Sequence, residues 1–485
     1  MRHLFLSLAC VLAGAAAPGH ALPLESCRLP GVETAARCGV VRRPLDPAAP
    51  SGLSIDVHFA VIPALARHRK PDPVFFLAGG PGQSAIQLAG SVQALLGRLG
   101  NRRDLVLVDQ RGTGRSAPLA CEDEAAASRP LADMLDGARQ QQVLRECRQA
   151  LQKLPHGDLR LYTTTVAMQD LDAVRQALGA ERINLVGGSY GTRAALEYMR
   201  QHPGRVRRAV LDGVAPPDMA LPAAMSADAQ SALEQVLAGC EREPACAGRF
   251  PALRDRWQLL LRSLPREVEL PHPMTGRTER VTMTRDSVLS LVRGVLYQPA
   301  LAAGLPAALF EASQGRFAPL SGLAAALMGR GGAAQIAQGM HFSVICAEDG
   351  PRLGLSREAQ APDFGATTAD LYRRVCADWP RGAVPEAFYR MPQASGATMV
   401  LSGGADPVTP PRHGERAAQA LGPQARHVVV AQAGHGVMAL PCVRDLLFRF
   451  IDAPDDAQAL AVDAACVAQV PRPLPYLPLA GGGRP

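Results

Sequence analysis

Several features that mark other classes of protein are scarce or missing in this chain of 485 residues. Aromatic side chains make up only 4% of it, lysine occurs only at Lys70 and Lys153, and the arginines are scattered among acidic residues. A nucleic-acid-binding surface needs a dense basic stripe, often with aromatic side chains that stack on bases. We therefore expect no nucleic-acid partner, although the formal net charge is +7.

Long apolar runs and metal-binding cysteine patterns are also missing. After the first 21 residues, no stretch approaches the roughly 18 uninterrupted apolar residues of a membrane-spanning helix, so we expect no stable membrane insertion. No Cys-x-x-Cys pair or cysteine–histidine cluster has zinc spacing, so we expect no metal. With 47% hydrophobic residues the chain can bury a large core, and its length favours a core with an added domain.

The N-terminus has the pattern of an export signal. Arg2 and His3 supply positive charge, an apolar run covers Leu4–Ala17, and small residues before and at Ala21 suit a signal peptidase. We predict a signal peptide over residues 1–21 and an exported protein, in the periplasm or outside the cell.

The cysteines agree with export. Cys10 falls within the predicted signal peptide and leaves an even number. In an exported chain this count predicts disulfides. Neighbours along the chain could pair, although the sequence leaves the connectivity open. These neighbouring pairs would be Cys27 with Cys38, Cys121 with Cys147, Cys240 with Cys246, Cys346 with Cys376, and Cys442 with Cys466.

Short apolar runs separated by helical stretches predict an α/β protein with a mostly parallel sheet covered by helices. The alternating segment Leu53–Ile62 predicts an early antiparallel strand. Helices are expected at Val166–Leu178 and Thr192–Gln201. Buried strands are expected at Val74–Ala78, Leu105–Asp109, Ile183–Val186, Arg208–Leu211, Thr398–Leu401 and His427–Ala431.

The strand pattern stops in the middle of the chain. Between Pro216 and Pro392, Ala- and Leu-rich helical segments broken by Pro and Gly replace the apolar strands. We predict an α/β core over residues 22–216 and 393–485. A mainly helical cap over residues 217–392 would be inserted after the sixth core strand.

The strongest chemical signal is the segment Gly187-Gly188-Ser189-Tyr190-Gly191, which lies between an expected strand and an expected helix. This is the G-x-S-x-G pattern of a nucleophile elbow in its required context. The turn is so tight that the residues two before and two after the serine must be almost free of side chain. We therefore predict Ser189 to be a catalytic nucleophile.

A nucleophilic serine needs a base, and the base needs an acid to orient it. With such an elbow the acid and the histidine follow the serine, each after a late strand. Asp406 and His435 have those positions, each in a glycine-rich loop. Asp212, after an earlier strand, is a rival acid. Four other histidines in helices, strands or the cap are rivals to His435 with a simpler packing role: His202, His341, His413 and His427.

An oxyanion hole needs two backbone N–H groups. One comes from the residue after the nucleophile, here Tyr190, and the other from the loop after an early strand. That loop is Gly79-Gly80-Pro81-Gly82, and by position we choose Gly80.

Together, Gly79–Gly82, Asp109–Ser116 and Gly188–Thr192 resemble the proline iminopeptidase family of α/β-hydrolases. The elbow and the stretch Gly404–Pro410 are similar to an exported, tripeptidyl-aminopeptidase-like branch of that family. The chain departs from the family at Ala78, where histidine is usual, which affects the packing of the loop more than a backbone contact. We expect residues 109–115 to brace the loops around the site.

The resemblance implies a cap that admits only the end of a peptide and binds its free amino terminus with carboxylates, because a desolvated ammonium needs a paired charge. Glu348 and then Asp349 are the candidates, with the adjacent Cys346 able to pin their loop by a disulfide. The alternative is that both acids lie on a solvated surface of the cap.

These patterns predict a serine hydrolase that needs no cofactor and removes residues or short peptides from a peptide with a free amino terminus. An esterase or amidase acting on a small acyl substrate would have the same triad and a different cap. A non-catalytic binding module is the third possibility, but such proteins usually lose a triad residue. The number of residues released, any preference for proline and the oligomeric state stay open.

Overall fold

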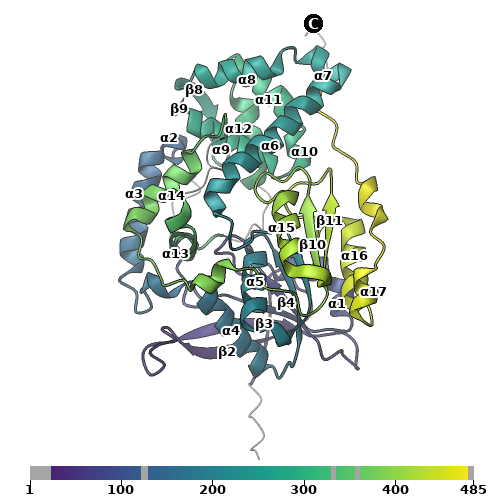
Figure 1. Cartoon of the computed structure of the whole chain (residues 1–485). Coiled ribbons are helices and arrows are strands. Elements are labelled where there is room, and N and C mark those ends of the chain that lie inside the picture. Colours follow the sequence, from purple (N-terminus) through teal and green to yellow (C-terminus); the bar gives the residue numbers. More distant parts are fainter. Residues whose placement is uncertain (1–22, 122–128, 329–334, 355–360, 479–485) are drawn as a thin grey trace, which may run out of the picture.

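The computed structural model describes residues 23–121, 129–328, 335–354 and 361–478 (Figure 1). The predicted signal peptide and Cys10 lie outside these ranges. None of the described helices is long and apolar enough to cross a membrane.

A nine-stranded sheet forms the centre of the α/β core, in the order β1-β2-β3-β5-β4-β6-β7-β10-β11. Strands β1 to β3 pair antiparallel, β3 pairs antiparallel with β5, and the rest of the sheet is parallel. The strands are β1 (Glu25–Cys27), β2 (Ala36–Pro44), β3 (Ser54–Ile62), β4 (Val74–Leu77), β5 (Leu105–Val108), β6 (Ile183–Gly188), β7 (Val206–Asp212), β10 (Thr398–Gly403) and β11 (Ala425–Val430).

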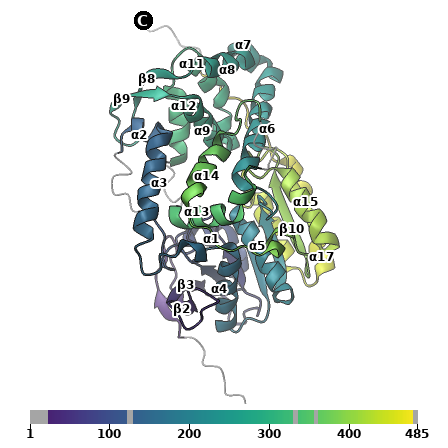
Figure 2. The same cartoon turned by 60° about the vertical axis from the view of Figure 1, so that its left-hand side comes forward.

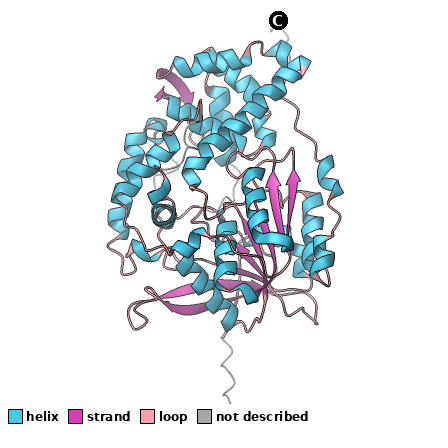
Figure 3. Ribbon diagram, in the orientation of Figure 1, coloured by secondary structure: helices cyan, strands magenta, loops and turns pink. Residues whose placement is uncertain are grey.

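Helices cover both faces of this sheet (Figure 3). Side chains of a strand alternate between its two faces, so Val106 packs in one core while Leu105 and Leu107 pack in the other. Helices α4 (Thr164–Ala177), α5 (Tyr190–Gln201) and α15 (Pro411–Leu421) cover the first face. Helices α1 (Ala89–Gly100), α16 (Pro441–Asp452) and α17 (Asp456–Leu460) cover the second.

The cap lies above the carboxyl ends of the parallel strands (Figures 1 and 2). It follows β7, which is the sixth strand when the short edge strand β1 is left out. It has its own hydrophobic core and one hairpin, β8 (Arg266–Pro271) with β9 (Thr278–Met283). Its helices are α6 (Leu221–Arg242), α7 (Pro244–Arg249), α8 (Leu253–Arg262), α9 (Arg285–Leu296), α10 (Pro299–Ala302), α11 (Leu305–Ser313), α12 (Ala318–Met328), α13 (Gln338–Glu348) and α14 (Thr367–Asp378).

Two further helices pack on the cap, although they come from the segment that the sequence assigns to the core. Helix α2 (Leu131–Leu135) contacts strand β9, and α3 (Gly137–Leu151) runs beside α13 and α14 (Figure 2). Leu131 is buried in the hydrophobic core of the cap. The cap is therefore built from two separate parts of the chain.

All ten cysteines of the described residues form disulfides, and each pairs with its neighbour along the chain, which confirms the predicted disulfides. Cys346–Cys376 joins α13 to α14 in the cap, and Cys442–Cys466 joins α16 to the C-terminal segment of the core.

Candidate active site

Ser189 lies in the sharp turn between β6 and α5, as the elbow pattern predicts. Its backbone has φ 55° and ψ −125°, a conformation that L-residues rarely adopt. The turn leaves no room for side chains beside it: a Cβ added to Gly187 would lie 2.5 Å from the carbonyl oxygen of Gly191, and one added to Gly191 would overlap the carbonyl oxygen of Leu77. The two glycines are thus required by close backbone packing.

His435 and Asp406 form a hydrogen-bonded pair. Nδ1 of His435 lies 2.8 Å from Oδ2 of Asp406, whose side chain is fully buried. The backbone N–H groups of Val408 and Thr409 donate to Oδ1 of Asp406 at 2.8 and 2.9 Å. Burial opposes the charge of Asp406, but His435 and these amides hold the pKa of its carboxyl below the ordinary value.

The same pair makes His435 more basic. Burial alone would lower the pKa of His435, but the negative charge of Asp406 and the hydrogen bond to it outweigh that effect and raise the pKa. With Nδ1–H donated to Asp406, Nε2 is the nitrogen left to accept a proton from a nucleophile. The pair has the arrangement that a general base requires.

Ser189 and His435 both lie beside the end of β7. The backbone N–H of Ser189 donates to the carbonyl oxygen of Asp212 at 2.8 Å. A Cβ added to the next residue, Gly213, would lie 3.3 Å from Cε1 of His435. In the described structure no hydrogen bond joins Oγ of Ser189 to His435. Such contacts are often formed only when substrate is bound.

Thr409 is a residue of this site that the sequence analysis did not single out. Its buried hydroxyl donates to Oδ2 of Asp406 at 2.8 Å and lies 3.1 Å from Nδ1 of His435. The signal was its position three residues after Asp406, from which a threonine side chain can return to the preceding acid.

The rival residues have other partners. Oδ2 of Asp212 accepts from the backbone N–H groups of Val437 and Met438, both at 2.8 Å, and the hydrogen bond from His435 Nδ1 goes to Asp406. The rival histidines lie beside other groups: His202 near Asp172, His341 with Pro81 and Tyr372, His413 with Asp228, and His427 with Ser402.

The glycine loop and the elbow are in direct contact, as an oxyanion hole requires. Tyr190 is the first residue of α5, so its backbone N–H faces outward from the N-terminal end of that helix. Gly80 has φ +111°, which favours glycine. A Cβ added to Gly79 would lie 3.3 Å from Cβ of Ser189, whereas one added to Gly80 would meet Gly82 and Gln83. Gly80 remains our predicted donor, and Gly79 is its neighbouring rival.

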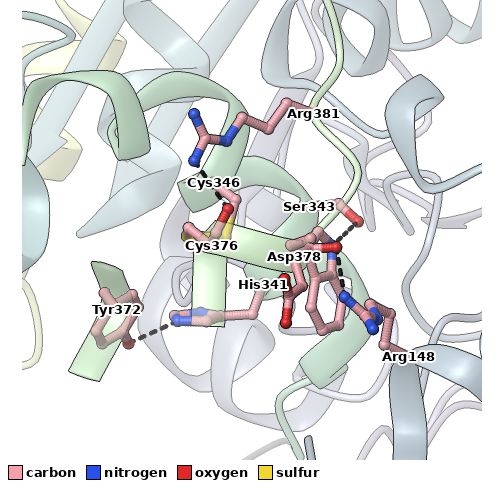
Figure 4. Close-up of a disulfide and its surroundings, with 9 residues drawn as sticks. Arg148, His341, Ser343, Cys346, Tyr372, Cys376, Asp378 and Arg381 are labelled. Atoms are coloured by element: carbon pink, nitrogen blue, oxygen red, sulfur yellow. Dashed lines mark hydrogen bonds between the residues drawn. A yellow bond between two sulfur atoms is a disulfide. The ribbon is translucent and has the colours of Figure 1, made fainter. Parts of the chain in front are cut away.

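The cap helix α13 docks on this glycine loop. The backbone N–H of Ala337 donates to the carbonyl oxygen of Gly82 at 2.9 Å. Nδ1–H of His341 donates to the carbonyl oxygen of Pro81 at 3.1 Å, which leaves Nε2 to accept from the hydroxyl of Tyr372 at 2.8 Å (Figure 4). Tyr372 belongs to α14, which the Cys346–Cys376 disulfide ties to α13. Cap and loop are thereby coupled.

Glu348 and Asp349 lie at the end of α13 and are both fully buried, so they are not on a solvated surface. Nη1 of Arg193, from α5, lies 2.8 Å from Asp349 and 3.6 Å from Glu348. Asp349 also accepts from the backbone N–H of Leu221 at 3.1 Å. Asp349 is therefore neutralised within the protein.

Glu348 is less completely paired. Its Oε1 accepts from the backbone N–H of Thr164 at 2.8 Å, and its buried Oε2 has no hydrogen-bond partner among the described residues. Burial raises the pKa of Glu348 to about 7. A buried carboxylate oxygen without a donor is the feature that an incoming ammonium group would satisfy. Its role as a substrate ligand remains a prediction.

The stretch 109–115 braces the loops, in agreement with the sequence. Oδ1 of Asp109 accepts from Oγ of Ser84 at 2.6 Å and from the backbone N–H of Ile86 at 3.1 Å. Arg111 forms a buried ion pair with Asp170 at 2.7 Å.

Over the described ranges, no group of three or more His, Cys, Asp or Glu side chains could hold a metal ion.

Comparisons with known proteins agree with this geometry. A family model described as alpha/beta hydrolase fold matches residues 72–439, which confirms the predicted fold class. Serine protease Hip1 of Mycobacterium tuberculosis is 30% identical over 416 residues, which cover 80% of this chain and 79% of that protein.

Two shorter matches carry peptidase names. A tripeptidyl aminopeptidase of Streptomyces lividans is 32% identical over 196 residues (37% of this chain and 36% of that protein). A proline iminopeptidase of Neisseria meningitidis is 29% identical over 143 residues (29% and 32%). The family resemblance seen in the sequence is confirmed.

Proposed function

The chain belongs to the α/β-hydrolase family, and the relatives reported above are named as a serine protease, a tripeptidyl aminopeptidase and a proline iminopeptidase. We propose that it is an exported serine exopeptidase. It would release amino-terminal residues or short peptides through an acyl-enzyme. The observation that carries the proposal is the His435–Asp406 pair placed beside the strained Ser189 turn, under a cap that contains a buried, incompletely paired carboxylate.

The chemistry follows from these positions. Nε2 of His435 takes the hydroxyl proton of Ser189 while Oγ attacks the scissile carbonyl carbon. Asp406 holds the imidazole in the required tautomer and stabilises the imidazolium. The backbone N–H groups of Tyr190 and Gly80 receive the oxyanion. His435 then protonates the leaving amine, and a water molecule repeats the cycle on the acyl-enzyme. No cofactor takes part.

Selection for a free amino terminus is assigned to Glu348. The ammonium of the substrate would lie against its Oε2, with Asp349 already held by Arg193. Because a buried carboxylate is stabilised by a cation, binding would draw Glu348 into its ionised form. A substrate with an acetylated amino terminus brings no ammonium to Oε2, whose opposite charge is then Nη1 of Arg193 at 3.6 Å, beyond hydrogen-bond distance. Such a substrate should therefore bind poorly.

Export is supported by the five disulfides, because such bonds persist in oxidising compartments and are rare in the cytosol. The signal pattern at the N-terminus points the same way. Expression with its own N-terminus, followed by fractionation and mass spectrometry of the mature protein, tests this part. Recovery from the cytosol with residue 1 intact would contradict it.

The substrate class is tested with purified mature protein. Aminoacyl-, prolyl- and tripeptidyl-chromogenic amides are each offered with a free and with an acetylated amino terminus, beside a short-chain ester, with Ser189→Ala as the inactive control. Among the amides, we expect cleavage of those with a free amino terminus and not of the acetylated ones, and the preferred length gives the number of residues released. Ester turnover without amide cleavage would instead support an esterase.

The role of Glu348 needs its own comparison. We expect Glu348→Gln to raise KM for free amides strongly while it leaves turnover of the ester nearly unchanged. Glu197→Gln is a matched control, because Glu197 is also a buried glutamate and pairs with Arg200 instead. An equal loss of ester and amide turnover in Glu348→Gln would contradict selection by this residue.

A further inference from the structure

Asp212 touches both halves of the catalytic centre. It is the last residue of β7, and its carbonyl oxygen accepts the backbone N–H of Ser189 at 2.8 Å. Its side chain reaches the other way: Oδ2 accepts the backbone N–H groups of Val437 and Met438, both at 2.8 Å. These are the second and third residues after His435. One buried residue therefore links the backbone of the nucleophile to the loop that carries the base.

The other carboxylate oxygen is unusual. Oδ1 of Asp212 is buried and has no hydrogen-bond partner within the described part of the chain. Asp212 is only 1% exposed, so water does not screen its charge. The ionisable groups that face it are His435 and Asp406, and among the described residues no arginine or lysine forms an ion pair with it. A buried carboxylate in such a position acts on the nearest ionisable groups through a medium of low dielectric constant.

We propose that Asp212 is a positioning residue of the hydrolytic reaction, which fixes the His435 loop through two backbone hydrogen bonds and whose negative charge stabilises the imidazolium. The proposal rests on the catalytic roles of Ser189 and His435 given above, but not on the choice of a peptide as substrate.

The hydrogen bonds give the first part of this role. His435 must meet Oγ of Ser189 within hydrogen-bond distance, and misplacement by about 1 Å can cost on the order of a hundredfold in rate. Asp212 holds both partners from one strand end, because its backbone binds Ser189 and its side chain binds the residues after His435. Asp406 and Thr409 fix the orientation of the imidazole ring, whereas Asp212 fixes the position of the loop that carries His435.

The charge gives the second part. Asp406 is the larger source of stabilisation for the imidazolium, and Asp212 adds to it without a direct hydrogen bond. Burial raises the pKa of Asp212 to about 6, against the opposing effect of the two backbone hydrogen bonds and of His435. The charge of Asp212 therefore contributes to the pH at which His435 loses its proton, which sets the acid limb of activity.

The test measures the rate at which a serine-directed fluorophosphonate inactivates the mature protein, as a function of pH. This reagent phosphonylates Ser189 when His435 is neutral: His435 takes the hydroxyl proton, Oγ bonds to phosphorus and fluoride leaves. The assay therefore needs no peptide substrate. Wild type is compared with Asp212→Asn, Asp212→Ala and Asp109→Asn. The last is the matched control, because Asp109 is an equally buried carboxyl that binds backbone amides and faces His58 instead of His435.

We expect Asp212→Asn to keep its plateau rate within about threefold, because the amide oxygen can still accept both backbone N–H groups. Its acid limb should move to lower pH, because a charge that favours imidazolium has been removed. Asp212→Ala should lose about tenfold or more of the plateau rate. Asp109→Asn should leave the acid limb where it is.

Thermal unfolding of every variant shows which of them are folded. Coincident acid limbs in wild type and Asp212→Asn, or an equal shift in Asp109→Asn, would overturn the proposed role of the charge. An unchanged plateau in a folded Asp212→Ala would overturn the role of the hydrogen bonds. No inactivation of wild type at any pH would refute Ser189 as a nucleophile and the role of Asp212 with it, whereas inactivation without peptide cleavage would affect only the substrate class.

Discussion

Removing the hydroxyl of Thr409 while keeping its shape should weaken the catalytic pair. The change is Thr409→Val, which replaces a buried O–H group by a methyl group of similar size. In the structure that hydroxyl donates to Oδ2 of Asp406, the oxygen that also binds His435. Its loss leaves Asp406 with two backbone donors on Oδ1 and only the imidazole on Oδ2.

The expected magnitude follows from the kind of hydrogen bond. A hydrogen bond to a charged group contributes about 1.5–3 kcal/mol. Since the imidazolium forms only in the transition state, we expect at least the lower end of this range to appear in the barrier. About 1.4 kcal/mol corresponds to a tenfold fall in kcat/KM. The free energy of unfolding should fall by about 1–2 kcal/mol as well.

The assay is steady-state hydrolysis of the best substrate from the panel above, together with urea unfolding. Thr409→Ser is the matched control, because it keeps the hydroxyl and loses only a methyl group. We expect Ser to restore most of the activity that Val loses. Equal kcat/KM in wild type and a folded Thr409→Val, or equal losses in the two variants, would refute the role given to this hydroxyl.

Two further results are expected. Because burial raises the pKa of Glu348 to about 7 from an ordinary 4.5, the folded state binds more protons than the unfolded state between these values, and stability should fall as pH rises through that window. The free energy of unfolding is measured with urea at pH 5 and at pH 8. In Glu348→Gln, the difference between these two values should be smaller than in wild type by up to about 3 kcal/mol. The same difference in both proteins would contradict the burial of this carboxylate. Replacing Cys346 and Cys376 by serine should cost about 2–4 kcal/mol of stability and raise KM, since the bond ties α14 to the helix that contacts the oxyanion loop. Cys442 and Cys466 close a loop of similar length away from the cap, so replacing them should cost similar stability and leave KM unchanged. An equal rise of KM in both double variants would contradict the coupling of α13 and α14 to the oxyanion loop.

The parallel half of the sheet was predictable because its strands are continuous apolar runs. Strand β2 was not predicted, because Arg37, Arg42, Arg43 and Pro44 interrupt its apolar pattern. Such residues are usual near the edge of a sheet, where one side of the strand is solvated. Helices α2 and α3 were not predicted either. Helix α2 has only five residues, and α3 is longer but mostly polar, so neither shows the apolar pattern of a core helix.

The candidate site divides in the same way. The three triad residues could be found because each lies in a loop that follows a strand, at a position characteristic of this fold: Ser189, Asp406 and His435. The partners of Glu348 could not be found, because Arg193 and Thr164 lie more than 150 residues away in sequence and meet it only after the cap docks. Thr409 binds the side chain of Asp406, and Asp212 binds backbone amides after His435. The sequence placed both residues after strands near the site, but it did not show these hydrogen bonds.

The most direct test of the central claim is to trap the acyl-enzyme. The mature protein is mixed with an activated ester of the aminoacyl or peptidyl group that the amide panel shows to be preferred, with a free amino terminus, then quenched in acid and analysed by mass spectrometry after digestion. We predict an adduct of that acyl group on Ser189, absent from Ser189→Ala and much reduced when the amino terminus is acetylated. Hydrolysis without an adduct on Ser189, or an equal adduct from the acetylated ester, would contradict the account.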